Sequence, residues 1–287
     1  MTVYTGHLRK MQVSYENSSK PVEYFLNLTD ADGQVSEENK NIAVNSLLGK
    51  SLSIHYKQEI HCVACGRKSN KSFNQGHCYP CLIRLASCDK CIMSPEKCHY
   101  EQNTCREPQW GLDNCMTDHY VYLANSSGIK VGITRANQIP TRWIDQGAIQ
   151  ALPIFKVSQR RYSGLLEVIY KTQVSDRTQW QRMLKGQVEK IDLIAHQQQL
   201  IELLTEEVTT LKNELGDGFI EAINATEMTE FVYPIIEYPT KIKSFNLDKQ
   251  AIIEGTLMGI KGQYLIFDSG VINIRKFSGY HIDLIVN

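Results

Sequence analysis

Residues 119–134 are HYVYLANSSGIKVGIT, two short alternating runs separated by a polar segment. Alternation of apolar and polar side chains with a period of two is typical of β-strands. The segment between the runs, Asn-Ser-Ser-Gly at 125–128, ends in a glycine, and this arrangement predicts a β-hairpin. Tyr120 and Tyr122 then project from one face of the hairpin. Gly132 has no side chain, so it leaves room for a close approach to the sheet.

The residues after the hairpin alternate between helical and strand patterns. Pro140 can begin a helix that carries Arg142. The run ALPIFKVS at 151–158 predicts a third strand, and YSGLLEVIYK at 162–171 predicts a second helix that carries Glu167. Glu167 lies among apolar residues, where burying an unpaired carboxylate is costly, so this residue is a candidate for a functional role.

All nine cysteines of the chain lie between residues 62 and 115, upstream of the hairpin. The first four form two Cys-x2-Cys pairs separated by twelve residues, a spacing typical of a structural zinc site closed by four thiolates. Gly66 follows the first pair and permits the tight turn that such a pair needs. The predicted ligands of this zinc are Cys62, Cys65, Cys78 and Cys81.

A second group of cysteines follows directly and predicts a second structural zinc. Its expected ligands are Cys88, Cys91, Cys98 and Cys105, with His99 and Cys115 as alternative donors. The other interpretation is that one or two of these thiols pack in the core. Zinc binding in such a polar segment would supply folding free energy that its small apolar content does not.

The formal net charge of the chain is zero, but the charge is unevenly distributed. Residues 119–186 contain ten basic and three acidic residues, a local net charge of +7. A basic module is the electrostatic footprint of a polyanionic partner, and the alternative is that these charges scatter over a solvated surface. The side chains predicted to bind nucleic acid, DNA or RNA, are Lys130, Arg135, Arg142, Lys156, Arg160 and Arg161.

The whole pattern predicts an α+β protein made of five segments. These are a β region at 1–60, a cysteine-rich zinc-binding block at 61–118, a three-stranded sheet with helices at 119–186, a long amphipathic helix at 187–218, and a C-terminal β domain, a small barrel or a sheet, at 219–287. The N-terminal residues YTGHLRKMQV resemble IEGTLMGIKG near the C-terminus, which is consistent with both ends contributing to one β unit.

The expected long helix, residues 188–215, carries apolar residues at intervals of seven. They are Ile194, Ile201, Val208 and Leu215. A stripe of this kind either packs against the rest of its own chain or pairs two copies in a homodimer. The first interpretation is preferred because the repeat is short for a coiled coil.

Composition and targeting signals predict a cytoplasmic protein. Hydrophobic residues make up 42% and charged residues 22% of the chain, which is ordinary for a globular protein. We find no signal-peptide pattern and no apolar run of the length that spans a membrane, so no membrane partner is expected.

The order of hairpin, helix with arginine, strand, and helix with glutamate resembles the GIY-YIG nuclease superfamily. Tyr120-Val121-Tyr122 stands at its first half-motif and Lys130-Val131-Gly132 at its second, where the superfamily normally begins with tyrosine. The resemblance covers residues 119–186, about a quarter of the chain. Together with the cysteines, the stretches TCREPQWG, KVGITR and TRWIDQGA are also similar to an uncharacterised prokaryotic family, DUF2797.

The GIY-YIG resemblance implies a catalytic set of Tyr122, Lys130, Arg142 and Glu167. Glu167 would hold one Mg²⁺ or Mn²⁺ ion, and Arg142 would bind the scissile phosphate. Tyr122 would orient or deprotonate the attacking water, with Lys130 as the cation that lowers its pKa.

Three functions are consistent with these features. The first is a metal-dependent phosphodiesterase that acts on nucleic acid. The second is a nucleic-acid-binding zinc protein with a degenerate nuclease module, in which Lys130 replaces the usual tyrosine. The third is a zinc-stabilised interaction scaffold that pairs through residues 188–215.

Overall fold

The computed structural model describes all 287 residues, and these form two compact units. Unit 1 consists of Met1–Ile83, Leu184–Gly186 and Val232–Asn287, and unit 2 consists of Arg84–Met183 and Gln187–Phe231. Helices and antiparallel sheets occur together, so the expected mixed α and β composition is confirmed. The cysteine-rich block is divided between the units, because the boundary follows Ile83.

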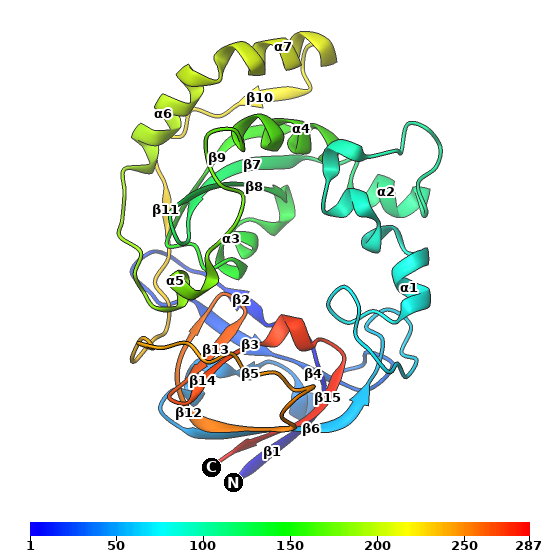
Figure 1. Cartoon of the computed structure of the whole chain (residues 1–287), viewed down its shortest axis with the longest axis vertical. Helices are drawn as coiled ribbons and strands as arrows, with labels where there is room; N and C mark the ends of the chain where they lie inside the picture. The colour runs from blue at the N-terminus through cyan, green and yellow to red at the C-terminus, as the bar shows by residue number, and fades with distance from the viewer. The chain divides into compact units, whose positions relative to one another are not determined.

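Unit 1 is built on a seven-stranded antiparallel sheet that curls (Figure 1). The strand order is β14-β13-β12-β6-β15-β1-β4. In chain order these strands are β1 (Thr2–Leu8), β4 (Leu28–Thr29), β6 (Ser51–Ile60), β12 (Ile252–Lys261), β13 (Tyr264–Phe267), β14 (Gly270–Asn273) and β15 (Tyr280–Val286). A second sheet contains β2 (Gln12–Ser14), β3 (Glu23–Leu26) and β5 (Ile42–Ala43).

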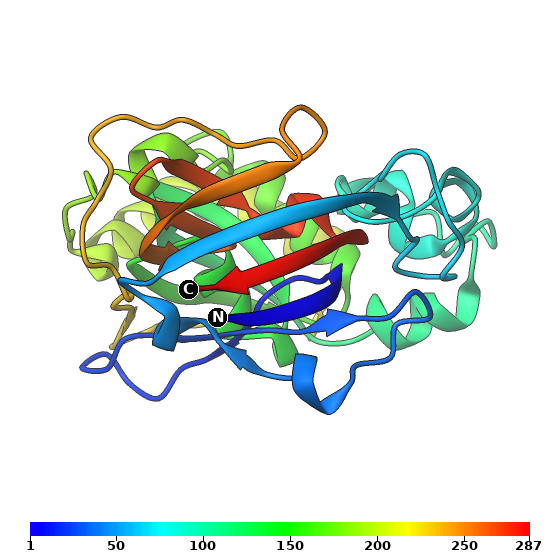
Figure 2. The ribbon, with the colours of Figure 1, turned by 90° about the horizontal axis from the view of Figure 1, so that it is seen from below.

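Both ends of the chain belong to the same sheet of unit 1. Thr2 pairs with Val286, so β1 and β15 lie side by side with the two termini at one end (Figure 2). The C-terminal strands therefore do not form a separate barrel or sheet. Long β6 lies between β12 and β15, pairs with both and buries Leu52 and Ile54, and β15 pairs in turn with N-terminal β1.

Unit 2 contains the hairpin expected from its alternating residues. Strands β7 (His119–Asn125) and β8 (Ile129–Arg135) pair in antiparallel register, and β9 (Gln150–Val157) lies on the other side of β7. The sheet has five strands rather than three, because β10 (Ile220–Ala222) and β11 (Thr229–Glu230) both pair with β9. These two short strands follow the helical segment and complete the sheet only through tertiary contacts.

The helices are α1 (Tyr79–Arg84), α2 (Pro108–Asn114), α3 (Thr141–Asp145), α4 (Arg160–Tyr170), α5 (Trp180–Leu184), α6 (Leu193–Leu203) and α7 (Thr205–Leu215). Helix α3 begins after Pro140 and carries Arg142, and α4 carries Glu167, as the sequence predicts. No helix combines the length and the apolar character that crossing a bilayer requires.

The expected single helix at 188–215 is two helices. Leu204, with φ −109° and ψ 13°, interrupts the helical geometry between α6 and α7. Leu204 is only 2% exposed and belongs to the same apolar core as Leu200, Val208 and Leu211. Because of the break, both helices pack against that core, so tertiary packing outweighs helix propensity here. Of the apolar stripe, Val208 is buried in this core and Ile194 and Leu215 pack against it, whereas Ile201 is not part of it.

Candidate functional site

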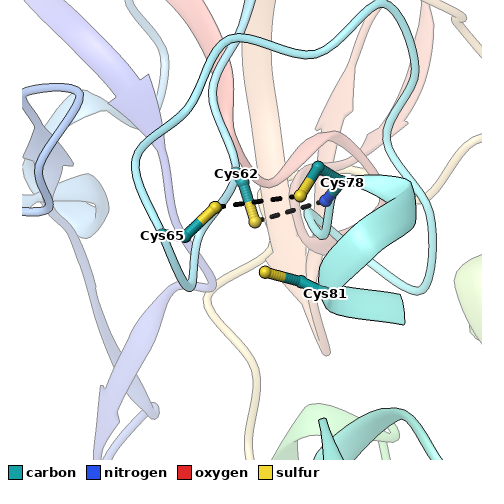
Figure 3. A group of neighbouring side chains, drawn as sticks. All are labelled: Cys62, Cys65, Cys78 and Cys81. Carbon is teal, nitrogen blue, oxygen red and sulfur yellow. Dashed lines mark hydrogen bonds between the residues drawn. The ribbon is translucent and has the colours of Figure 1, made fainter. Parts of the chain in front are cut away.

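Four sulfur atoms converge in unit 1. Cys62 and Cys65 follow β6, and Cys78 and Cys81 lie at the start of α1 (Figure 3). Their sulfurs all lie within 4.8 Å of one another, and the Sγ atoms of Cys65 and Cys78 are 3.7 Å apart. Sulfurs about 2.3 Å from one tetrahedral zinc lie about 3.8 Å from each other, so this thiol cluster fits the ion.

Local backbone geometry explains why these cysteines converge. Gly66 has φ +70°, a left-handed conformation that glycine adopts without a steric penalty, and its N–H donates to the Cys62 carbonyl at 2.9 Å. The N–H of Cys78 donates to the Cys62 sulfur at 3.2 Å. Burial opposes the thiolate, but this and other backbone N–H donors lower the pKa of Cys62 to about 7.

The thiols of Cys78 and Cys81 favour the neutral form in the absence of a cation. Burial raises the pKa of Cys78 and of Cys81, and the neighbouring sulfurs raise that of Cys81 further. Cys62, Cys78 and Cys81 are buried, and thiolates at buried positions are stable only when a cation compensates their charge. The cluster therefore has the donors and the spacing of a structural metal site with four protein ligands. It can hold a metal ion such as zinc.

The second group of cysteines is arranged differently. Cys88, Cys91, Cys98 and Cys105 do not form one compact set, and the group whose donor atoms lie within 4.8 Å of one another is Asp89, Cys91 and His99. Cys98 forms a hydrogen bond with Cys91, and this contact lowers the pKa of Cys98 to about 6. A second zinc remains a prediction.

The backbone around the second group explains this difference. Ala86–Cys88, Lys90–Ile92 and Pro95–Lys97 are successive 3-10 turns. Cys91 is followed by Ile92 and not by a glycine like Gly66, so the tight turn of the first site is not repeated. The Asp89 carboxylate also already accepts from the Arg106 guanidinium at 2.6 Å.

The four residues implied by the nuclease resemblance come from four elements of unit 2. Tyr122 lies on β7, Lys130 on β8, Arg142 on α3 and Glu167 on α4. Tyr122 and Lys130 lie on paired strands, and the charges of Arg142 and Glu167 act on both residues, so the four side chains lie near one another. We call this set the Tyr-Lys-Arg-Glu cluster.

Tyr122 is completely buried opposite Gly132. The two residues are cross-strand partners, and a Cβ on Gly132 would lie 2.6 Å from the Tyr122 hydroxyl oxygen. The space that the sequence predicts above Gly132 is therefore filled by the Tyr122 ring itself. The hydroxyl donates a 2.9 Å hydrogen bond to the Gln146 side-chain oxygen, a partner that the sequence analysis does not identify.

The acidity of Tyr122 differs from the expectation. Burial raises its pKa, while the nearby Arg142 guanidinium opposes this increase. The resemblance implied a lowered pKa with Lys130 as the responsible cation, whereas the pKa is raised and the cation that opposes this increase is Arg142. A tyrosine with a raised pKa is a poor proton acceptor near neutral pH.

The environment of Lys130 is more unusual than that of Tyr122. Its side chain is 3% exposed, and burial together with the Arg142 charge lowers its pKa to about 8. Glu167 and Asp176 oppose this decrease. A buried lysine with a pKa near neutrality exchanges its proton readily and can serve as a general base.

Glu167 belongs to a carboxylate pair that the sequence analysis does not identify. Burial raises the pKa of Glu167, while Lys171, whose Nζ lies 3.5 Å from the Glu167 carboxylate, opposes this increase. The same Nζ lies 3.1 Å from the Asp176 carboxylate. The spacing of four residues between Glu167 and Lys171 on a helix could have indicated their contact, whereas nothing local indicates Asp176.

Four of the basic residues predicted to bind nucleic acid already have partners in unit 2. Arg135 donates to the Asn114 side chain, Lys156 pairs with Asp118 at 2.9 Å, Arg160 donates to the Ile92 carbonyl at 2.8 Å, and Arg161 pairs with Glu101 at 2.8 Å. All four partners precede the hairpin in the chain. These contacts hold the part of the cysteine-rich block that belongs to unit 2 against the strands and helices that follow it.

Unit 1 contains a cavity of about 500 Å³, which none of the predicted site residues lines. His7 and His281 contribute to its wall, and their rings stack with centroids 4.6 Å apart. The Nε2 atom of His7 lies 2.7 Å from Nδ1 of His61. These histidines are far apart in the sequence and no spacing pattern indicates their contact.

Comparisons with curated proteins and with solved structures give no match. The resemblance to GIY-YIG nucleases therefore rests on the sequence motifs alone. A family model matches residues 49–282, more than half of the chain, and this span includes the thiol cluster and the Tyr-Lys-Arg-Glu cluster. On this match, the chain belongs to the family described as Protein of unknown function (DUF2797).

Proposed function

We propose that unit 2 is a GIY-YIG-like, divalent-metal-dependent phosphodiesterase that acts on nucleic acid. The observation that carries this proposal is the convergence of Tyr122, Lys130, Arg142 and Glu167 from four elements of the unit. A phosphate-binding guanidinium, an amine of shifted pKa and a carboxylate are the groups that hydrolysis of a phosphodiester needs.

Each charged residue has a role that follows from its chemistry. Arg142 presents a planar guanidinium to two phosphate oxygens. Glu167 would hold the divalent ion, which would supply Lewis-acid stabilisation of the charge that develops on the phosphate. The Glu167 side chain is 13% exposed, so the carboxylate lies in a sheltered position.

We assign the general base to Lys130 rather than to Tyr122. The neutral amine accepts one proton from water while the water oxygen bonds to phosphorus and the bond to the leaving oxygen breaks. With a pKa of about 8, a fraction of Lys130 is neutral at pH 7. Tyr122 positions the site through Gln146 and through its packing against Gly132.

Nucleic acid is the substrate that the charge distribution favours. The module at 119–186 carries a local net charge of +7 in a chain that is otherwise acidic. Lys130 and Arg142 are basic residues of the cluster itself, whereas Arg135, Lys156, Arg160 and Arg161 have partners within the unit. The backbone of a nucleic acid is the polyanion that such a module recognises.

A second candidate function is nucleic-acid binding without cleavage. It is favoured by one observation, the complete burial of Tyr122, whose hydroxyl donates to Gln146 instead of facing solvent. In that function Arg142 and Lys130 bind phosphates, and no proton transfer takes place.

Incubation with single-stranded DNA, duplex DNA and RNA in Mg²⁺ or Mn²⁺ tests the proposal. We expect cleavage of at least one substrate, reduced at least about a hundredfold in Glu167→Gln. Glu202→Gln, at an exposed position of α6, is the matched control and should cleave like wild type. Binding measured in parallel should persist in Glu167→Gln and weaken with salt. Binding without cleavage by the wild type would favour the second candidate function.

A further inference from the structure

The part of unit 1 that surrounds the thiol cluster carries basic residues and no acidic ones. No aspartate or glutamate occurs between Glu59 and Asp89. Of the basic residues that unit 1 has in this stretch, Lys68 forms an ion pair with Glu59 at 2.6 Å, whereas Arg67 and Lys71 are exposed to solvent. The surface around the thiol cluster is therefore complementary in charge to a polyanion.

Two aromatic rings accompany these charges. Tyr79, the first residue of α1, is 58% exposed, and its ring meets that of Phe73 edge to face with centroids 5.8 Å apart. Ile83 lies one helical turn after Tyr79 and is 55% exposed. An exposed ring of this kind is a platform on which an unpaired base can stack, because every base has an aromatic face.

The thiol cluster brings Arg67 close to Tyr79. The Sγ atoms of Cys65 and Cys78 are 3.7 Å apart. Arg67 follows Cys65 by two residues, and Tyr79 follows Cys78 by one. The N–H of Cys62 also donates to the Arg67 carbonyl at 2.9 Å, which fixes the backbone of Arg67 beside the cluster.

A tight turn places Lys71 on the other side of the same tyrosine. Phe73 and His77 exchange two backbone hydrogen bonds of 2.7 and 2.8 Å, and the two residues after Phe73 have left-handed φ values of 41° and 62°. Lys71 precedes Phe73 by two residues, and the Phe73 ring contacts Tyr79. A surface held by such a turn loses little conformational entropy when it binds a partner.

We propose that Arg67, Lys71 and Tyr79 form a binding surface for single-stranded nucleic acid, in which the two cations bind phosphates and the tyrosine ring stacks on an unpaired base. We call these three residues the Arg-Lys-Tyr surface. A duplex keeps its bases stacked and paired, so only a single strand can use the ring as well as the charges. The inference goes beyond the proposed function, since the surface lies in unit 1 and binding there involves no cleavage.

Fluorescence anisotropy of the full-length protein with labelled oligo-dT, oligo-U and a DNA duplex of the same length tests the role of the ring. No Mg²⁺ or Mn²⁺ is added, so that cleavage does not contribute. We expect Tyr79→Ala to bind both single strands about tenfold more weakly than wild type and the duplex equally well. Tyr79→Phe keeps the ring and should bind like wild type. Tyr238→Ala, at another exposed position of unit 1, is the matched control and should also bind like wild type.

The salt dependence of oligo-dT binding tests the role of the two cations. Replacement of Arg67 and Lys71 by glutamine should make the plot of log K against log salt concentration shallower by about 0.7 for each cation removed. Lys50→Gln combined with Lys249→Gln makes the same change of charge at exposed positions of unit 1 and should leave the slope unchanged. Thermal unfolding of every variant verifies that it is folded.

Photochemical cross-linking needs no variant. Oligo-dT that carries 5-iodouracil in place of some thymines, irradiated in complex with the wild-type protein, should cross-link to Tyr79, because this base reacts with the aromatic side chain on which it stacks. Mass spectrometry of the digested complex identifies the linked residue.

Cross-links confined to residues 119–186, or equal affinity of Tyr79→Ala and wild type for single strands, would overturn the proposal. Binding through Tyr79 without cleavage of any nucleic acid supports the Arg-Lys-Tyr surface and contradicts the phosphodiesterase function. Cleavage by wild type, together with unchanged single-strand binding in Tyr79→Ala, supports that function and contradicts the surface. The two proposals therefore fail separately.

Discussion

At the scale of single residues, the chemistry of unit 2 depends on which groups are buried. Tyr122 and Lys130 lie on neighbouring strands and are both almost inaccessible, yet burial raises the pKa of Tyr122 and lowers that of Lys130 to about 8. Burial disfavours the charged form in both cases. The pKa of Lys130 is thereby brought closer to physiological pH, and the pKa of Tyr122 is moved further from it.

Replacement of Lys130 by methionine should stabilise the protein at pH 7. The folded-state pKa of about 8 lies below the ordinary 10.5, a difference of about 3 kcal/mol. The lowered pKa means that charged Lys130 destabilises the fold below pH 8, and that this penalty disappears as the pH rises through 8 toward 10.5. Urea unfolding at pH 7 and at pH 10.5 should show a large gain for Lys130→Met at pH 7 and little at pH 10.5. An equal gain at both values would exclude charge burial as its cause.

Cleavage should depend on pH through the same lysine. If neutral Lys130 accepts the proton, kcat/KM rises with pH and has a midpoint near 8. Lys130→Arg keeps the charge at all accessible pH values, so its residual rate should be independent of pH between 6 and 9. A wild-type midpoint that persists in Lys130→Arg would assign the titration to another group.

At the scale of secondary structure elements, helix α4 connects the sheet of unit 2 to the cysteine segment of the same unit. Its residue Gly164 packs against the 3-10 turn Pro95–Lys97, and a Cβ there would lie 2.6 Å from the Glu96 nitrogen. Arg160 and Arg161 at the start of α4 bind Ile92 and Glu101. The helix is therefore held on one side by close backbone packing and at its start by two arginines.

Gly164→Ala should destabilise unit 2, although alanine is the better helix former. The gain in helix propensity is about 1 kcal/mol, while a clash with rigid backbone costs about 1–3 kcal/mol, so the net effect is a loss. The control is Val168→Ala on the exposed side of α4, which should change stability little. A higher melting temperature for Gly164→Ala would contradict the close packing of α4 against residues 95–97.

At the scale of the whole molecule, the cysteine-based metal site and the nuclease-like cluster belong to different units. The thiol cluster lies in unit 1, and the Tyr-Lys-Arg-Glu cluster lies in unit 2. A structural metal contributes folding free energy directly to the unit that binds it. Loss of the metal from the thiol cluster should therefore affect the stability of unit 1 first.

Cys81→Ser should lose the zinc of unit 1 and lower the free energy of unfolding by several kcal/mol, since one of four ligands is removed from a closed site. Elemental analysis and thermal unfolding measure the two effects. Cys88→Ser is the matched control, because Cys88 lies outside both compact donor groups, and it should retain its zinc. A loss of zinc in Cys88→Ser would restore the four-thiolate set predicted for the second site.

The sequence by itself determined the features that depend only on residues close together in the chain. The Cys-x2-Cys spacing and Gly66 specify the thiol cluster, and alternation specifies the hairpin. The residues following Pro140 determine helix α3, because such patterns depend on neighbours within a few positions.

Only the tertiary structure decided the features that depend on distant residues. Thr2 pairs with Val286 across the chain, Asp176 reaches Lys171 through a strand-like contact with β8, and burial at Leu204 divides the expected long helix in two. Pairing, burial and shifted pKa values are properties of the packed environment, which no short stretch of residues contains.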